Sequence, residues 1–78
     1  MNYMEIIKGE REDHDESQRD LASFLGIAQT VYWRYETNKV ELPIRHFIEI
    51  CHHYQVSADY LLGIPYNYRR PKPRTKID

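Results

Sequence analysis

A short segment of polar and aromatic residues carries the side chains best suited to recognition chemistry. On a helix from Ala28 to Glu36, one arc of about 140 degrees collects Gln29, Thr30, Trp33, Arg34 and Thr37. A glutamine amide can pair with adenine, an arginine can pair with guanine or grip a phosphate, and a threonine methyl or an aromatic face can meet a thymine methyl. The other side of this helix is suited to packing and carries Ala28, Val31, Tyr32 and Tyr35. The alternative is that this arc is an ordinary solvated helix face. The neighbouring elements must decide between the two interpretations.

Catalytic and metal-binding chemistry has weaker support. Four candidate ligands fall close together, namely His46, Cys51, His52 and His53. His46 and His53 share a helix face, but two histidines fall short of a metal site, and Cys51 points toward the expected core. We therefore expect a solvated or partner-facing histidine cluster. No nucleophile with a base and an orienting third group is evident, so neither an enzyme nor a cofactor is expected.

Charge is unevenly distributed along the 78 residues, although the net charge is only −1. Residues 1–20 carry three bases against seven acids, residues 21–56 three against three, and residues 57–78 five against two. Binding to phosphates must therefore come from a local surface. Cys51 is the only cysteine, and no apolar stretch approaches a membrane span. We expect a soluble cytoplasmic protein without a membrane partner.

Sparse proline and glycine predict helices almost throughout. The first is expected over Tyr3 to Asp13. The second begins at a capping box of Ser17 and Asp20 and ends at Gly26, and the third spans Ala28 to Glu36. A fourth begins at Pro43, with a core stripe of Ile44, Phe47, Ile48, Cys51 and Tyr54. Ser57 caps a fifth over Ala58 to Leu62. The expected fold is an all-α, compact five-helix bundle over residues 1–64. Residues 65–78 form a basic tail, expected to be mobile, with an arm on phosphates as the alternative.

In order along the chain, Gln18, Leu21, Ala22, Leu25, Gly26, Ile27, Tyr32 and Tyr35 follow the pattern of two helices joined by a tight turn. Through these residues, and through Val56 to Gly63, the sequence resembles the Cro/repressor (Xre-type) helix-turn-helix family, which is lambda-repressor-like in fold. The resemblance implies double-stranded DNA as the partner. It places base reading on Gln29, Thr30 and Arg34, flanked by Ala28 and Trp33. It places phosphate contacts on Ser17, Gln18, Thr37 and Lys39.

The resemblance also implies an internal ion pair between Arg11 and Glu36. The sequence supports this pair independently, because both residues extend apolar packing stripes on which a lone charge would be costly. Some positions depart from the family. Glu10 and Glu16 replace leucine-like residues, so looser packing or partial exposure is expected there. Asn38 replaces a glycine and is a candidate for a positive φ. Trp33 stands where relatives are small or polar, which leaves its contact open among thymine, a phosphate-bound side chain and another subunit.

One short helix reads few bases, so we expect a repressor-like homodimer that spans two half-sites. Pairing is expected through the fifth helix and the residues after it, including Tyr60, Ile64 and Tyr66. The alternative is an antitoxin-like module that sequesters a protein partner with the same fold.

Overall fold

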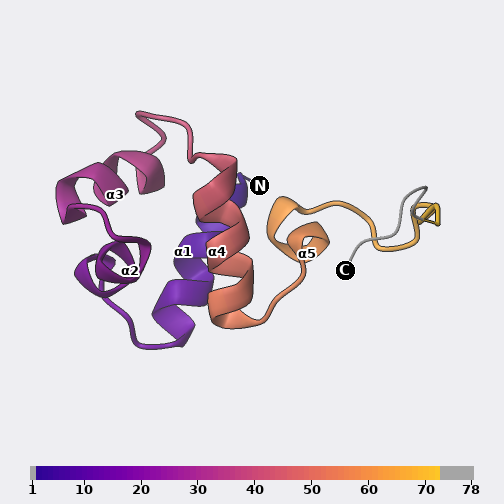
Figure 1. Ribbon diagram of the computed structural model, residues 1–78, viewed down its shortest axis with the longest axis horizontal. Coiled ribbons are helices and arrows are strands. Elements are labelled where there is room, and N and C mark those ends of the chain that lie inside the picture. Colours follow the sequence, from indigo (N-terminus) through magenta and orange to yellow (C-terminus); the bar gives the residue numbers. More distant parts are fainter. Residues whose placement is uncertain (1, 73–78) are drawn as a thin grey trace.

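Five helices make up the part of the chain that the computed structural model describes, residues 2–72 (Figure 1). They are α1 (Tyr3–Asp13), α2 (Gln18–Leu25), α3 (Gln29–Glu36), α4 (Ile44–Tyr54) and α5 (Ala58–Leu62). No strand occurs within these residues, and the all-α prediction is confirmed. The last six residues of the predicted basic tail, 73–78, lie outside the described part.

Local capping interactions explain why these helices begin and end where they do. The Ser17 hydroxyl accepts a hydrogen bond from the Asp20 amide, and the Asp20 carboxylate accepts one from the Ser17 amide, which forms the predicted capping box. Gly26 ends α2 in the left-handed conformation, at φ 73°. Asn38 also has a positive φ, 61°, as predicted for this position after α3. The helix α3 begins one residue later than expected, because Ala28 is its N-cap.

The helices are arranged so that α2 and α3 lie on one side of the molecule and α5 on the other (Figure 1). Between them run α1 and α4. The helix α1 packs against both α3 and α5, while α2 packs chiefly on α3. The helix-turn-helix unit is therefore one end of the domain, and α5 lies at the opposite end.

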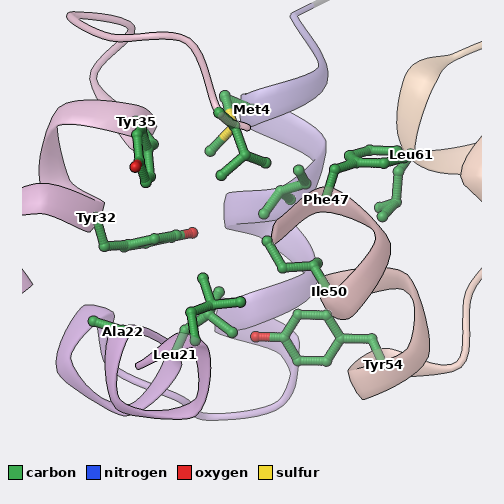
Figure 2. Close-up of a cluster of buried hydrophobic side chains, with 12 residues drawn as sticks. Met4, Leu21, Ala22, Tyr32, Tyr35, Phe47, Ile50, Tyr54 and Leu61 are labelled. Atoms are coloured by element: carbon green, nitrogen blue, oxygen red, sulfur yellow. The ribbon is translucent and has the colours of Figure 1, made fainter. Parts of the chain in front are cut away.

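The core is a single cluster at the junction of all five helices. Tyr32 and Tyr54 reach into it from opposite sides (Figure 2). The largest side chains that are fully buried are Tyr32, Met4, Ile7, Leu21, Ile50 and Leu61. Burial raises the pKa of Tyr32, and the neighbouring Glu36 carboxylate raises it further, so this residue stays a neutral phenol. Each helix contributes at least one side chain to this cluster, so detaching any one helix would expose the core to solvent.

The predicted core stripe of α4 is only partly right. Phe47 and Tyr54 are buried as expected, but Ile44 is 69% exposed and Ile48 is 49% exposed. The buried positions are instead His46, Phe47, Ile50 and Tyr54. The apolar stripe of α4 is wider than the face that contacts the neighbouring helices, so the isoleucines at the margin of the stripe remain in solvent. Phe24 of α2 is similarly exposed, at 46%.

A buried ion pair joins α1 to α3. Arg11 Nε donates a hydrogen bond to Glu36 Oε2, and Arg11 Nη2 donates one to Glu36 Oε1, each at 2.9 Å. The two side chains are 8% and 2% exposed. The remaining Arg11 nitrogen, Nη1, donates to the Glu16 carbonyl oxygen at 2.7 Å. Both charges are thus compensated inside the protein, which is the condition for burying them without a large penalty.

Replacing Glu36 by alanine should lower the free energy of unfolding by about 3 to 5 kcal/mol, because Arg11 would remain buried without its partner. Chemical denaturation of the variant measures this loss. Glu12→Ala is a matched control, since Glu12 is exposed on α1, and should change stability by less than about 0.5 kcal/mol. Equal stabilities for the Glu36 variant and the control would contradict a stabilising role for the pair.

Candidate nucleic-acid interface

The turn between α2 and α3 fixes the angle at which the two helices meet. Gly26 turns the chain, and the Ile27 amide then donates to the Ala22 carbonyl oxygen at 3.0 Å. Ala22 is only 1% exposed, so its small side chain is packed inside the domain. Tyr32 and Leu21 fill the space beneath. The pair of helices therefore behaves as one rigid unit that presents a defined outer surface.

The outer face of α3 carries the residues singled out for base reading. Gln29, Thr30 and Arg34 are exposed, and Trp33 is 43% exposed. The inner face holds Tyr32 and Tyr35, which are buried. Val31, expected on the packing side, is 38% exposed because it lies at the border between the two faces. The N-cap Ala28 is also exposed and makes no side-chain cap.

Residues after the middle of α3 shape the edge of this surface. The Lys39 Nζ atom lies over the Trp33 ring, 5.8 Å from its centroid, a distance suited to a cation–π interaction. The Thr37 hydroxyl donates to the Trp33 carbonyl oxygen at 2.8 Å. These contacts bring Trp33, Thr37 and Lys39 together at the carboxyl end of the helix. The Trp33 side chain remains 43% exposed beside Lys39.

At the amino end of α2, Ser17 is exposed and Gln18 is partly buried. The Ser17 hydroxyl accepts from the Asp20 amide in the capping box. The hydrogen bond that the Ser17 backbone amide donates to the Asp20 carboxylate, followed by the Ser17 side chain, lowers the pKa of that carboxyl group. The Gln18 Nε2 atom donates to Glu36 Oε1 at 3.0 Å. Gln18 thereby links the start of α2 to the buried ion pair and keeps a second amide hydrogen for an outside acceptor.

Comparison with known proteins assigns this arrangement to a family. A helix-turn-helix family model matches residues 7–61. The chain belongs to the Xre-type helix-turn-helix family. An uncharacterized HTH-type transcriptional regulator of Bacillus subtilis strain 168, YobD, is 31% identical over 62 residues, which is 80% of this chain and 55% of YobD. The chain thus spans about half the length of that relative. No solved structure matches the chain.

Membership of the helix-turn-helix family indicates that residues 7–61 form a non-enzymatic DNA-binding domain. The histidines of α4 have structural partners that their sequence spacing did not reveal. His46 is 4% exposed, and its Nδ1 atom contacts Glu49 Oε1 at 2.9 Å. Within residues 2–72, no cluster of three or more His, Cys, Asp or Glu side chains could hold a metal ion. Burial raises the pKa of the Cys51 thiol, so it stays protonated near neutral pH.

Glu16 is the residue whose role the sequence did not indicate. Its side chain is 24% exposed, which agrees with the expectation of looser packing at this junction. However, Glu16 Oε1 accepts a hydrogen bond of 2.6 Å from the Tyr54 hydroxyl. His53 Nε2 lies 3.0 Å from Glu16 Oε2. The loop before this helix-turn-helix is therefore tied to α4 by polar contacts instead of apolar packing, and His53 is not simply solvated.

Both partly buried carboxylates near α2 are held in the charged form. Burial alone would raise the pKa of Glu36, but hydrogen bonds from Arg11 and Gln18 outweigh it and lower the pKa. Burial also opposes ionisation of Glu16, whose pKa is lowered by hydrogen bonds from Tyr54 and His53.

Within residues 2–72, no helix is both long enough and apolar enough to cross a bilayer.

These lowered pKa values predict a loss of stability in acid. The unfolded chain binds protons at Glu16 and Glu36 near their ordinary pKa of 4.5, while the folded chain does so only at lower pH. Their stabilisation is complete above pH 4.5 and is lost as the pH falls through the folded values. Glu16→Gln should reduce the slope of the unfolding free energy against pH, by the equivalent of up to one bound proton. Parallel pH profiles for the variant and the wild type, measured by denaturation below pH 4.5, would contradict this.

Proposed function

We propose that the chain is a sequence-specific transcriptional regulator that represses by binding double-stranded DNA in the cytoplasm. The helix α3 enters the major groove, and its outer face reads the bases. The observation that carries this proposal is the division of α3 into a buried face, with Tyr32 and Tyr35, and an exposed face of hydrogen-bonding side chains. A helix with that division, fixed to a second helix by a tight turn, can be presented to the groove as a rigid element.

In this proposal the exposed residues divide into two groups by position. Gln29, Thr30 and Arg34 read base edges near the middle of the interface, with Ala28 and Trp33 beside them. Phosphates are contacted at its margins by Ser17, Gln18, Thr37 and Lys39. Gln18 lies at a helix amino terminus, where free amide groups and the helix dipole favour an anion. Trp33 lies beside Lys39, and its exposed ring is available to a thymine methyl, a phosphate-bound side chain or another subunit.

The local charge supports binding that relies on base contacts more than on general attraction. Between residues 17 and 39 the bases are Arg19, Arg34 and Lys39, and the acids are Asp20 and Glu36. Glu36 is neutralised by Arg11, which leaves a modest positive excess on the surface. Non-specific affinity should be low in consequence, since it depends on the number of phosphates neutralised.

The proposed active form is a homodimer that places two copies of α3 about one helical turn, roughly 34 Å, apart on the DNA. The support is a set of exposed apolar side chains on α4, on α5 and just after α5, namely Ile44, Ile48, Leu62 and the predicted Tyr60, Ile64 and Tyr66. Ile44 and Leu62 also line a groove of about 200 Å³, together with Tyr3, Glu41, Leu42 and Phe47. Capture of a protein partner on this surface is the second candidate function, because the same exposed side chains would serve it.

Selection from a random pool of duplex DNA, followed by sequencing of the bound fraction, tests the main proposal. Enrichment of one motif with two related halves is the expected result. Absence of any enriched motif at low salt would overturn it. Co-purification of a small protein chain, with no motif enriched, would establish the second candidate function instead.

Gln29→Ala should weaken binding to the selected duplex by about 1 to 3 kcal/mol and relax the preference at one base position of each half-site. Lys39→Ala is the contrasting variant. It should weaken binding to all sequences alike and reduce the slope of log affinity against log salt by about one. Competition titrations with single-base variants of the duplex measure both effects. A uniform loss for Gln29→Ala would remove Gln29 from the base readers.

Ile48→Glu should convert the dimer to a monomer, because a charge would be buried within the proposed apolar interface. Sedimentation of the free protein measures this. Val40→Glu is a matched control, since Val40 is 48% exposed, close to the 49% of Ile48, but lies in the loop after α3. A wild-type chain that sediments as a monomer both free and on DNA would refute the homodimer.

A further inference from the structure

Glu16 occupies a position from which it can control the start of α2. It precedes Ser17, the N-cap of that helix, and follows Asp15, whose positive φ of 55° turns the chain out of α1. Its carboxylate faces α4, where the Tyr54 hydroxyl lies 2.6 Å from Oε1, and His53 Nε2 lies 3.1 Å from Oε1 and 3.0 Å from Oε2. These contacts join residues 37 and 38 positions apart in the sequence. They connect the loop directly to the last turn of α4.

The backbone of Glu16 is fixed on its other side. Its amide donates to the Arg11 carbonyl oxygen at 3.1 Å, and its carbonyl oxygen accepts from Arg11 Nη1 at 2.7 Å. Arg11 is the residue that pairs with Glu36, which in turn accepts a hydrogen bond from Gln18. Glu16 is therefore held between α4 and the buried ion pair. A shift of its carboxylate would be passed to the residues that begin α2.

A second contact joins α2 to the same histidine. The Phe24 ring stacks on His53, with centroids 4.0 Å apart and an angle of 25° between the planes. This explains why Phe24 points away from the core and yet is only half exposed. His53 is thus in contact with α2 near its carboxyl end through Phe24 and with the loop before its amino end through Glu16.

We propose that Glu16, held by His53 and Tyr54, is a positioning residue for the amino end of α2 and makes DNA binding depend on the protonation of His53. The dependence on DNA rests on the proposed function, in which Ser17 and Gln18 contact phosphate. Neutral His53 can donate one hydrogen bond to Glu16 through Nε2. Protonated His53 adds a charge to that bond, and charge-assisted hydrogen bonds are shorter and stronger.

The direction of the pH effect follows from the groups around this contact. Glu16 faces Asp20 of α2, Arg11 of α1, and His53 and Tyr54 of α4. The His14 ring lies against Tyr54, and Glu36 of α3 lies beyond Arg11. Glu16 remains ionised over the range in which histidines titrate, since its pKa is lowered. Because a charged His53 would hold Glu16 more tightly than a neutral one, we expect the contact to be tighter at lower pH.

The test measures affinity for the duplex selected by the wild-type chain, at pH 6 and pH 8, well below the melting temperature. His52→Gln is the matched control, because His52 is exposed on the same helix and adjoins His53. From pH 6 to pH 8, the affinity for the duplex should fall in wild type and in His52→Gln. The factor of this fall should be about two to five times larger than in Glu16→Gln and His53→Gln. A purely structural role would lower stability without changing this difference. Equal pH dependence in all four proteins would overturn the proposal.

Hydrogen exchange in the free protein tests the positioning step without DNA. The Leu21 amide donates to the Ser17 carbonyl oxygen at 3.2 Å and so reports the first turn of α2. After correction for intrinsic exchange, its protection should be about twofold or more higher at pH 6 than at pH 8 in wild type and His52→Gln, but equal in Glu16→Gln. Unchanged protection in wild type would overturn the proposal. If the Leu21 amide shows the predicted protection but the chain selects no duplex, the proposed function is refuted and the positioning role remains supported.

Discussion

The buried pair of Arg11 and Glu36 is the interaction on which the rest of the arrangement depends. Two hydrogen bonds of 2.9 Å join α1 to α3, and Gln18 adds α2 through the same carboxylate. Arg11 also holds the Glu16 carbonyl oxygen, which fixes the loop between α1 and α2. A small domain has little apolar surface to bury, so one polar center that touches three helices constrains their relative positions strongly. Directional hydrogen bonds specify an arrangement that apolar packing alone would leave less defined.

This center determines which surface of α3 is free. Glu36, Tyr32 and Tyr35 face inward, and their burial leaves the opposite side of the helix to solvent. The side chains on that side are the ones whose donors and methyl groups match base edges. The same constraint separates the two proposed surfaces, because α3 lies at one end of the domain and α5 at the other, with α4 between them (Figure 1). DNA binding and subunit pairing can then occur together.

Much of this could be predicted from local sequence. The capping box at Ser17, the turn at Gly26 and the positive φ of Asn38 depend on a few neighbouring residues, and the structure has them where expected. The burial of α4 was harder to predict, because periodicity gives an apolar stripe but not the width of the face its neighbours cover. The contact between Glu16 and His53 joins distant positions of opposite chemical character. A carboxylate at an expected leucine position signalled only weaker packing there, and nothing local indicated its partners.

The central claim is that α3 and the amino end of α2 form the DNA-binding surface. Amide chemical-shift mapping of the isotope-labelled chain, titrated with the duplex that it selects, tests this most directly. The account predicts that the largest changes fall on Ser17, Gln18 and residues 28–39, with small changes on the exposed face of α4 and α5. Changes concentrated on α4 and α5, with residues 28–39 unaffected, would contradict it.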